Sequence, residues 1–382
     1  MTQLNIRHFG HLADVKLDLG DLTVLVGPQG SGKSLALQWL KTALDGKRII
    51  RELKGAGEDA GDAAKVVDLI FGVGMGAAWT SSTHVTLDGK EVTPSTIARR
   101  GSDVERVFFI PAHRAMLISD GWAAPFQKLS AETPVVARLF SQNLFVLFSP
   151  TGPGDDLFPR DRLLKKQYRD LIDHAVFHGG RVSLEQDSLH AKRLKLTHGN
   201  AQLPFMTWTA GQREFTPLLL GLYHLLPPRK LKKQPDVEWV VIEEPEMGLH
   251  PQAISVVMLL CLDLLWRGYR VVLSSHSPLV LTVAWMLRRL QESHARWPLV
   301  LDAFGVDEAG QVELKEVAQT ALVKEVRTYS LSFGSDGLVR SKDISTLDPG
   351  DEDDDVAGWG GLAGYGSRFG DAVRRAVNEG GK

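Results

Sequence analysis

Hydrophobic and polar residues alternate along the first 26 positions, which is typical of β-strands with one buried face. Leu4 and Ile6 share a face of the first predicted strand, and a second strand follows a turn near Gly10. The run Thr23–Val26 is short and apolar, as expected for a buried strand. From Ser34 onward the apolar residues recur at helical spacing. The pattern therefore predicts a strand, a glycine-rich turn and a helix in succession.

The alternation typical of strands and the spacing typical of helices both recur through the rest of the chain. Strands and hairpins are predicted at 83–93, 106–110, 192–205, 239–242, 270–273, 299–304 and 311–317. Helices are predicted at 65–71, 134–148, 163–176, 211–226 and 252–267. Because strands alternate with helices, we expect an α/β fold with a parallel sheet.

A stretch rich in proline, glycine and small polar residues at 149–154 marks a break in the chain. We expect a first part of the core domain, an inserted helix and hairpin lobe, a second part of the core, and a C-terminal extension, at 1–149, 150–205, 206–320 and 321–382. The extension becomes acidic at Asp351–Asp355 and then glycine-rich. We interpret this end as a solvated tail or a docking segment rather than a metal site.

Composition narrows the class of protein. The 382 residues are 43% hydrophobic and 24% charged, with a formal net charge of -2, so wholesale disorder and a general polycation are excluded. Cys261 is the single cysteine, which excludes an intrachain disulfide and a multi-cysteine zinc site. The most apolar stretch, 256–266, contains Asp263 and is too short to span a bilayer. We expect a cytoplasmic protein with no membrane partner.

The turn after the third strand matches the phosphate-binding pattern G-x-x-x-x-G-K-[ST]. Its residues, called the phosphate loop below, are Gly27, Pro28, Gln29, Gly30, Ser31, Gly32, Lys33 and Ser34. The glycines let backbone N–H groups surround phosphate oxygens, and the following helix N-terminus adds positive potential. In this pattern Lys33 reaches the β- and γ-phosphates and Ser34 is a Mg²⁺ ligand.

A second group of polar residues follows the apolar strand 239–242. Glu243 and Glu244 stand at its C-terminal end. Glu243 can hold the Mg²⁺ shell, and Glu244 can orient and polarise an attacking water. The alternative is a pair of solvated acids at a strand end, which the phosphate loop makes the weaker interpretation.

Four motifs in one order resemble the ABC-type ATPases of the SMC/RecF/OLD group, which genome annotation often labels AAA-family ATPases. They are the phosphate loop, 209–212, 243–246 and 275–277. The resemblance covers residues 1–50 and 205–320. It implies a P-loop NTPase fold with an ABC-type core, a small antiparallel β lobe and a mixed helix and hairpin insertion. It also implies ATP hydrolysis with ATP and Mg²⁺ as cofactors.

The resemblance assigns further residues. Thr209, Ala210, Gly211 and Gln212 take the place of the family's L-S-G-G-Q signature and are called the signature turn below. In the family this turn meets the γ-phosphate bound by the other protomer, which implies a homodimer or a higher even oligomer. His276 matches the switch histidine, so Lys33, Glu244 and His276 form the expected catalytic set. A plain helix N-cap at Thr209 and a structural His276 are the alternatives.

The chain departs from the family pattern in three places. The carboxylate pair is Glu-Glu, and the D-loop at 247–250 ends in His250 rather than aspartate. No clear Q-loop glutamine follows the strand 106–110, where His113 and Arg114 stand instead. Toprim nuclease motifs and long coiled coils are not found in the sequence.

These features predict an ATP-driven switch of prokaryotic DNA maintenance or antiphage defence that works with a separate effector protein. A regulatory scaffold that holds a toxin or effector inactive is the alternative, and a transporter subunit fits less well. Nucleic acid is a further candidate partner. The basic residues that could contact it are Arg160, Arg162, Lys165, Lys166, Arg169, Lys192, Arg193, Lys195, Arg229, Lys230, Lys232 and Lys233.

Overall fold

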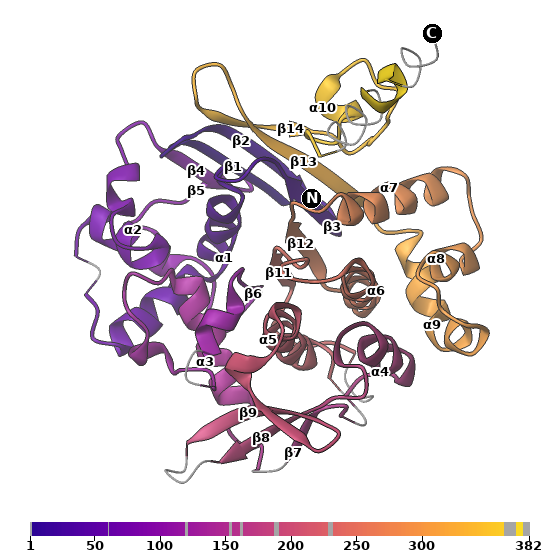
Figure 1. Ribbon diagram of the computed structural model, residues 1–382. Helices are drawn as coiled ribbons and strands as arrows, with labels where there is room; N and C mark the ends of the chain where they lie inside the picture. Colours follow the sequence, from indigo (N-terminus) through magenta and orange to yellow (C-terminus); the bar gives the residue numbers. More distant parts are fainter. Residues whose placement is uncertain are drawn as a thin grey trace.

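The computed structural model describes residues 2–59, 61–118, 121–152, 155–160, 163–186, 191–227, 232–362 and 372–376. Within them the chain forms a three-layer α/β core, a small antiparallel sheet at one end, and a helical region beside α7 (Figure 1). The predicted α/β fold class, with a parallel core sheet and a mixed helix and hairpin insertion, is confirmed.

The large sheet is mixed, with the order β5-β4-β1-β2-β14-β13-β3-β12-β11-β6. Its strands are β1 (Thr2–Phe9), β2 (Leu12–Leu19), β3 (Leu22–Val26), β4 (His84–Leu87), β5 (Lys90–Glu91), β6 (Val107–Ile110), β11 (Trp239–Glu243), β12 (Arg270–Ser274), β13 (Val326–Phe333) and β14 (Val339–Asp343). The five strands from β13 to β6 are parallel to one another. The predicted N-terminal antiparallel strands are the other edge of this same sheet.

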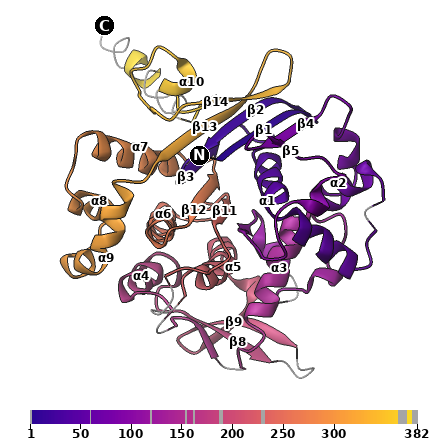
Figure 2. The same cartoon turned by 180° about the vertical axis from the view of Figure 1, so that it is seen from behind.

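Helices cover both faces of the sheet (Figures 1 and 2). They are α1 (Lys33–Gly55), α2 (Ala63–Phe71), α3 (Val135–Leu147), α4 (Lys166–Ile172), α5 (Ala210–Leu225), α6 (Pro251–Arg267), α7 (Pro278–Glu292), α8 (Pro298–Ala303), α9 (Glu308–Ala321) and α10 (Asp354–Ala357). On β3, Val24 and Val26 belong to the core beneath α5, α6 and α7, whereas Leu25 belongs to the core beneath α1. This two-residue alternation places one apolar core on each side of the sheet.

The predicted insertion folds as a four-stranded antiparallel sheet beside α4. Its strands are β7 (Asp155–Phe158), β8 (Arg181–Gln186), β9 (Lys192–His198) and β10 (Ala201–Pro204). The insertion packs on α5: the rings of Phe177 and Phe215 lie 6.0 Å apart, and the Tyr223 hydroxyl donates to the Leu157 carbonyl at 2.8 Å. The insertion and α5 therefore share one hydrophobic core.

Two late strands were predicted wrongly. Residues 299–304 and 311–317 lie in α8 and α9, not in strands. The buried residues Leu314, Val317, Ala318 and Ala321 follow helical spacing, which the valine content of the segment had obscured.

The C-terminal extension predicted at 321–382 begins inside the core. Its first part forms β13 and β14, which lie between β3 and β2 in the large sheet. The following segment continues to pack on the core: the Trp359 indole donates to the Leu347 carbonyl at 3.1 Å, and its ring lies 6.3 Å from that of Trp285 on α7. The part of the predicted tail up to Leu362 is thus attached to the domain.

Candidate functional site

Four loops meet at the C-terminal edge of the parallel strands. The phosphate loop follows β3, Ala112 and Arg114 follow β6, Glu244 follows β11, and His276 follows β12. This edge is where open parallel sheets bind ligands, because loops from neighbouring strands converge there.

The phosphate loop has the backbone shape that its glycines permit. Gly30 and Gly32 have φ values of 78° and 79°, in the left-handed region. A side chain at Gly27 would collide with the Leu331 carbonyl on β13. The loop ends at α1, whose N-cap Gly32 has no capping side chain, so the first N–H groups of the helix are available to an anion such as phosphate.

Lys33 lies inside this loop. Its side chain is buried, and its ammonium donates to the carbonyls of Gly27 at 2.9 Å and Pro28 at 3.0 Å. Burial lowers the pKa of Lys33 to about 8, an effect that the nearby carboxylates of Glu244 and Glu246 oppose. A phosphate group would offer this cation the counter-charge that the carbonyls supply only in part.

Glu243 fits the role of a magnesium ligand. It is buried, and its Oε2 accepts a hydrogen bond from the Ala112 N–H at 3.1 Å. Its Oε1 is also buried and accepts no hydrogen bond from the described residues. Burial raises the pKa of Glu243, while the Ser34 hydroxyl and the Ala112 N–H oppose the rise. A buried carboxylate oxygen beside a serine hydroxyl suits Mg²⁺, which uses one or two protein ligands plus substrate phosphates.

Glu244 and His276 face each other. The Nε2 of His276 lies 3.6 Å from Oε1 of Glu244, and both side chains are about one-third exposed. Burial, with the Lys33 ammonium, lowers the pKa of His276, so its imidazole is neutral at pH 7. Glu244 has a φ of 43°, which is strained for a residue with a Cβ. Residues at functional sites often store strain of this kind.

Glu246 belongs to the 243–246 motif but was not predicted to be a site residue. Its Oε1 accepts from the Ser275 hydroxyl at 2.8 Å and from the His276 N–H at 2.6 Å, so it fixes the loop that carries the histidine. Its buried Oε2 has no partner among the described residues. The glutamate two positions after the carboxylate pair was the only sequence signal for it.

The signature turn caps α5. The Thr209 hydroxyl accepts from the Gln212 N–H at 3.3 Å, and the Gln212 side chain accepts from the Thr209 N–H at 3.2 Å. This is a capping box, so the N-cap alternative describes the local structure correctly. Thr209 and Ala210 are exposed. A Cβ on Gly211 would lie 2.9 Å from the Gly248 carbonyl, so the turn packs closely on the D-loop.

The structure thus brings Lys33, Ser34, Glu243, Glu244 and His276 together at one edge. Across the described chain, none of the hydrogen bonds or ion pairs joins the signature turn directly to the phosphate loop. His250, the departure in the D-loop, accepts at Nδ1 from the Gln252 N–H at 3.4 Å and caps α6.

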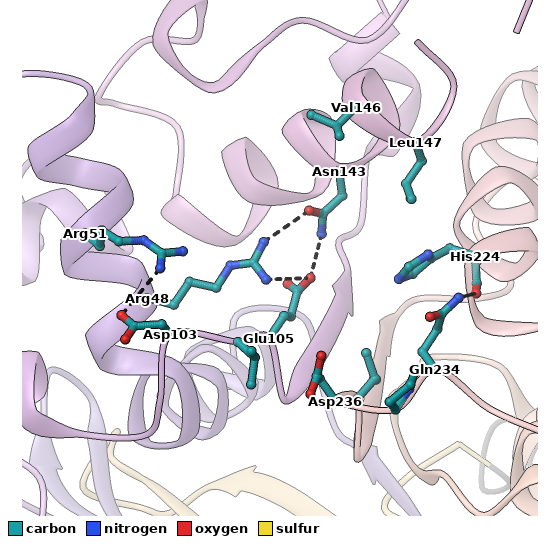
Figure 3. A pocket seen from close by; sticks show the side chains of 13 residues that line it. Arg48, Arg51, Asp103, Glu105, Asn143, Val146, Leu147, His224, Gln234 and Asp236 are labelled. Carbon is teal, nitrogen blue, oxygen red and sulfur yellow. Dashed lines mark hydrogen bonds and ion pairs between the residues drawn. The ribbon is translucent and has the colours of Figure 1, made fainter. Parts of the chain in front are cut away.

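A separate cavity of about 400 Å³ lies at the opposite end of the strands, before β6 and β11 (Figure 3). None of the predicted site residues lines it. Four of its charged groups pair with each other: Arg48 with Glu105 at 3.2 Å and Arg51 with Asp103 at 3.4 Å. This cavity is therefore not the expected nucleotide site.

The basic clusters are largely engaged within the chain. Lys166 pairs with Asp170 at 3.1 Å, and Lys195 pairs with Glu185 at 2.6 Å. Lys192 donates to three carbonyls of the linker, including that of Thr151 at 3.0 Å. Arg162, Arg229 and Lys230 lie outside the described residues. These contacts give the predicted nucleic-acid surface no support, and it stays a prediction. Among the described helices, none is long and apolar enough to cross a membrane.

Comparison with known proteins gives one family match. Residues 149–282 match the family model described as "AAA domain, putative AbiEii toxin, Type IV TA system". A search of curated proteins finds no match. The matched segment contains the insertion, the signature turn, the carboxylate pair and His276.

Three solved structures are similar at low identity. An SMC head bound to the C-winged helix domain of ScpA has a TM-score of 0.45 and 10% identity, over 89% of this chain and 96% of that one. The SMC head domain from Thermotoga maritima has a TM-score of 0.38 and 12% identity, over 89% and 97%. An Smc head with an extended coiled coil, bound to the C-terminal domain of ScpA derived from Pyrococcus furiosus, has a TM-score of 0.38 and 9% identity, over 90% and 96%.

Proposed function

We propose that this chain, an ABC-type P-loop ATPase of the SMC/RecF group, binds and hydrolyses ATP and dimerises around the nucleotide. The observation that carries the proposal is the convergence of Lys33, Ser34, Glu243, Glu244 and His276 at the ends of the three adjacent strands β3, β12 and β11. Each of these groups has a distinct task in phosphoryl transfer to water.

The role of each residue in ATP hydrolysis is assigned from its burial and its contacts. Lys33 and the N-terminus of α1 hold the phosphates, and Ser34 with Glu243 would hold Mg²⁺. The ion would neutralise charge on the β- and γ-phosphate oxygens. Glu244, partly exposed and turned toward His276, accepts the proton of the attacking water. The neutral His276 can hydrogen-bond the γ-phosphate or that water.

The second half of the site comes from another copy of the chain. The signature turn is exposed at the N-terminus of a sixteen-residue helix, which is a favourable position for a phosphate oxygen. Two such turns facing two phosphate loops make a closed two-fold dimer. ATP would stabilise this dimer, and its hydrolysis would release it.

The wider role we propose is a switch in prokaryotic DNA maintenance or antiphage defence, acting with an effector. The matched family description names a toxin and a toxin–antitoxin system, which supports a defence setting and also the scaffold alternative. Co-purification from the native host separates the two. A switch releases its effector once ATP is hydrolysed, whereas a scaffold keeps its effector bound whether or not ATP is hydrolysed.

The Glu244→Gln variant tests the enzyme role. Removing the base should lower the hydrolysis rate by about 100-fold or more and leave ATP binding intact, because the amide cannot take the water's proton. The variant should therefore accumulate as an ATP-bound dimer, which light scattering after size exclusion detects.

Lys33→Ala is the control, because it should neither bind ATP nor dimerise in its presence. A Glu244→Gln protein that stays monomeric in ATP and Mg²⁺, or that hydrolyses ATP at the wild-type rate, would contradict the proposal.

A further inference from the structure

Arg114 occupies the place after β6 where the expected Q-loop glutamine is missing. Its side chain is fully buried. It begins a short turn after His113, whose φ of 49° reverses the chain there. A fully buried arginine needs a strong structural reason, since moving its charge out of water is costly.

The guanidinium joins three elements through main-chain carbonyls. Its Nε donates to the carbonyl of Glu214 on α5 at 2.9 Å. Its Nη1 donates to Pro111 after β6 at 3.2 Å and to Glu243 on β11 at 3.0 Å, and its Nη2 donates to Glu244 at 3.4 Å. One side chain therefore contacts both α5, which the signature turn begins and which is called the signature helix below, and the backbone of the carboxylate pair.

The surrounding charges explain why an arginine can be buried here. Burial lowers the pKa of Arg114, but the carboxylates of Glu214, Glu246, Glu244 and Glu243 oppose this, so the group keeps its charge. The carboxylate of Glu214 lies 4.0 Å from Nε, and its Oε2 also accepts from the Ala115 N–H at 3.4 Å. The planar guanidinium fork of arginine donates to carbonyls in several directions at once. The compact ammonium of lysine cannot reach the same set of carbonyls.

The backbone that Arg114 holds is the strained one. Glu244 keeps its left-handed conformation while its N–H donates to the Ser274 carbonyl at 2.9 Å and its carbonyl accepts from Arg114. These two contacts fix the peptide planes on either side of the residue. The direction of the Glu244 side chain toward the attacking water therefore depends on the position of Arg114.

We propose that Arg114 is a positioning residue that couples the signature helix to Glu244. This inference rests on the proposed function. Glu214 lies five residues after Thr209 on the same helix, so a phosphate that draws the exposed N-terminus of α5 also shifts the Glu214 carbonyl. Arg114 passes that shift to the Glu243 and Glu244 backbone. Engagement of the signature turn by the partner's nucleotide would thereby align the catalytic glutamate in the same copy.

The Arg114→Lys variant tests the coupling. Lysine keeps the charge but loses the fork, so Glu244 should be misaligned while the phosphate loop is untouched. We expect kcat to fall about 10- to 100-fold. The Kd for a fluorescent ATP analogue should stay within about twofold of wild type, because the binding groups are unchanged.

Arg138→Lys is the matched control. Arg138 is also fully buried and pairs with Glu58 at 2.7 Å, but it lies on α3, away from the site. Its substitution should lower the melting temperature and leave kcat per folded molecule at the wild-type value. A purely structural role for Arg114 would give the same result as this control, with kcat unchanged.

A second variant keeps the coupling testable if Arg114→Lys does not fold. Glu214→Ala removes the carboxylate beside Arg114 at a helical position that accepts alanine. Glu214→Ala should also lower kcat and leave the Kd for the ATP analogue unchanged, but the fall in kcat should be smaller than in Arg114→Lys. Unchanged kcat in both variants, or equal loss of nucleotide binding and kcat, would overturn the coupling. If the wild-type protein hydrolyses no ATP, the proposed function fails first and the coupling fails with it. If it hydrolyses ATP and Arg114→Lys keeps its kcat, only the coupling fails.

Discussion

At the scale of single residues, the site combines buried acids with few cations. Glu243 and Glu246 each have a buried carboxylate oxygen without a partner in the described chain, while Lys33 and Arg114 are the nearby positive groups. Unpaired buried carboxylates are unfavourable on their own. A divalent cation and a nucleotide would together supply the missing contacts, which supports the Mg²⁺-ATP assignment.

The sequence was sufficient for residues whose role follows from a linear pattern. Gly27–Ser34 and the pair Glu243 and Glu244 were predicted from spacing and from the strands before them, and the structure brings them together. Arg114 and Glu246 were not recognised as site residues. Their roles depend on contacts between loops far apart in the chain, such as the bond from Arg114 to the Glu243 carbonyl. No local pattern encodes such a contact.

The buried charge network of Lys41 gives a prediction at this scale. Its ammonium contacts Asp45 and Glu105, each at 2.7 Å, with all three groups buried. Lys41→Met would leave the buried Asp45 carboxylate without an ion-pair partner and Glu105 with Arg48 alone, and should lower the free energy of unfolding at pH 7 by about 3–5 kcal/mol. Urea titration measures this.

Lys47→Met is the control for this network, because Lys47 pairs with Asp103 at 2.7 Å on the exposed surface. Its substitution should cost less than about 1 kcal/mol. Burial acts to raise the pKa of Glu105, but Lys41 and Arg48 outweigh it and hold that pKa below its usual value. The stabilisation from Glu105 is therefore present above pH 4.5 and is lost as the pH falls below it. Equal effects of the two substitutions would contradict the network.

At the scale of elements, several helices and buried strands lie where the periodicity of apolar residues predicted them. α1, α5, α6 and the strands β3, β6, β11 and β12 lie where the pattern predicted them, within a few residues. The failures came late in the chain. The apolar run in α8 is too short for its period to be decided, and β13 carries polar residues such as Thr328 and Ser330 although it is central in the sheet. Tertiary packing, which the local pattern of residues does not encode, decided the type of these elements.

The segment after β14 has a structural role that was not predicted. Lys342 pairs with Asp355 at 3.0 Å, and Trp359 packs beside Trp285 on α7. Trp359→Ala should lower the free energy of unfolding by about 2 kcal/mol, because part of the indole leaves an apolar contact. Chemical denaturation monitored by circular dichroism measures the change.

Glu352→Ala, at an exposed position of the same segment, should change the free energy of unfolding by less than about 0.5 kcal/mol. If Trp359→Ala is equally silent, the segment is a free tail, as the acidic composition suggested. A stable Trp359→Ala protein that loses only an effector would instead favour the docking interpretation.

At the scale of the whole molecule, one edge of the sheet holds the phosphate loop and the carboxylate pair, while the signature turn opens the helix on which the insertion packs. The Gln212 side chain donates to the Val176 carbonyl at 3.2 Å, so the turn and the insertion are connected. A partner that binds the insertion could therefore influence the signature turn. The composite site between two copies is the central claim that these positions support.

Subunit complementation tests that claim most directly. Lys33→Ala removes the phosphate loop's cation, and Ala210→Glu places a carboxylate at the exposed start of α5, where it would repel a γ-phosphate. Each variant alone should be inactive, and Ala210→Gln, of equal size without charge, should keep most of its activity. Ala210→Glu changes an exposed residue and leaves the hydrophobic core unchanged. Lys33→Ala removes one cation from the phosphate loop.

The decisive measurement is the ATPase rate of an equal mixture of the Lys33→Ala and Ala210→Glu proteins. In a mixed dimer one site combines the intact phosphate loop of one copy with the intact signature turn of the other. The account predicts that mixing restores ATP hydrolysis to at most about half of the wild-type rate, because each mixed dimer has one intact site out of two. A mixture as inactive as its components, beside an active wild type and active Ala210→Gln, would show that no site is completed across two copies.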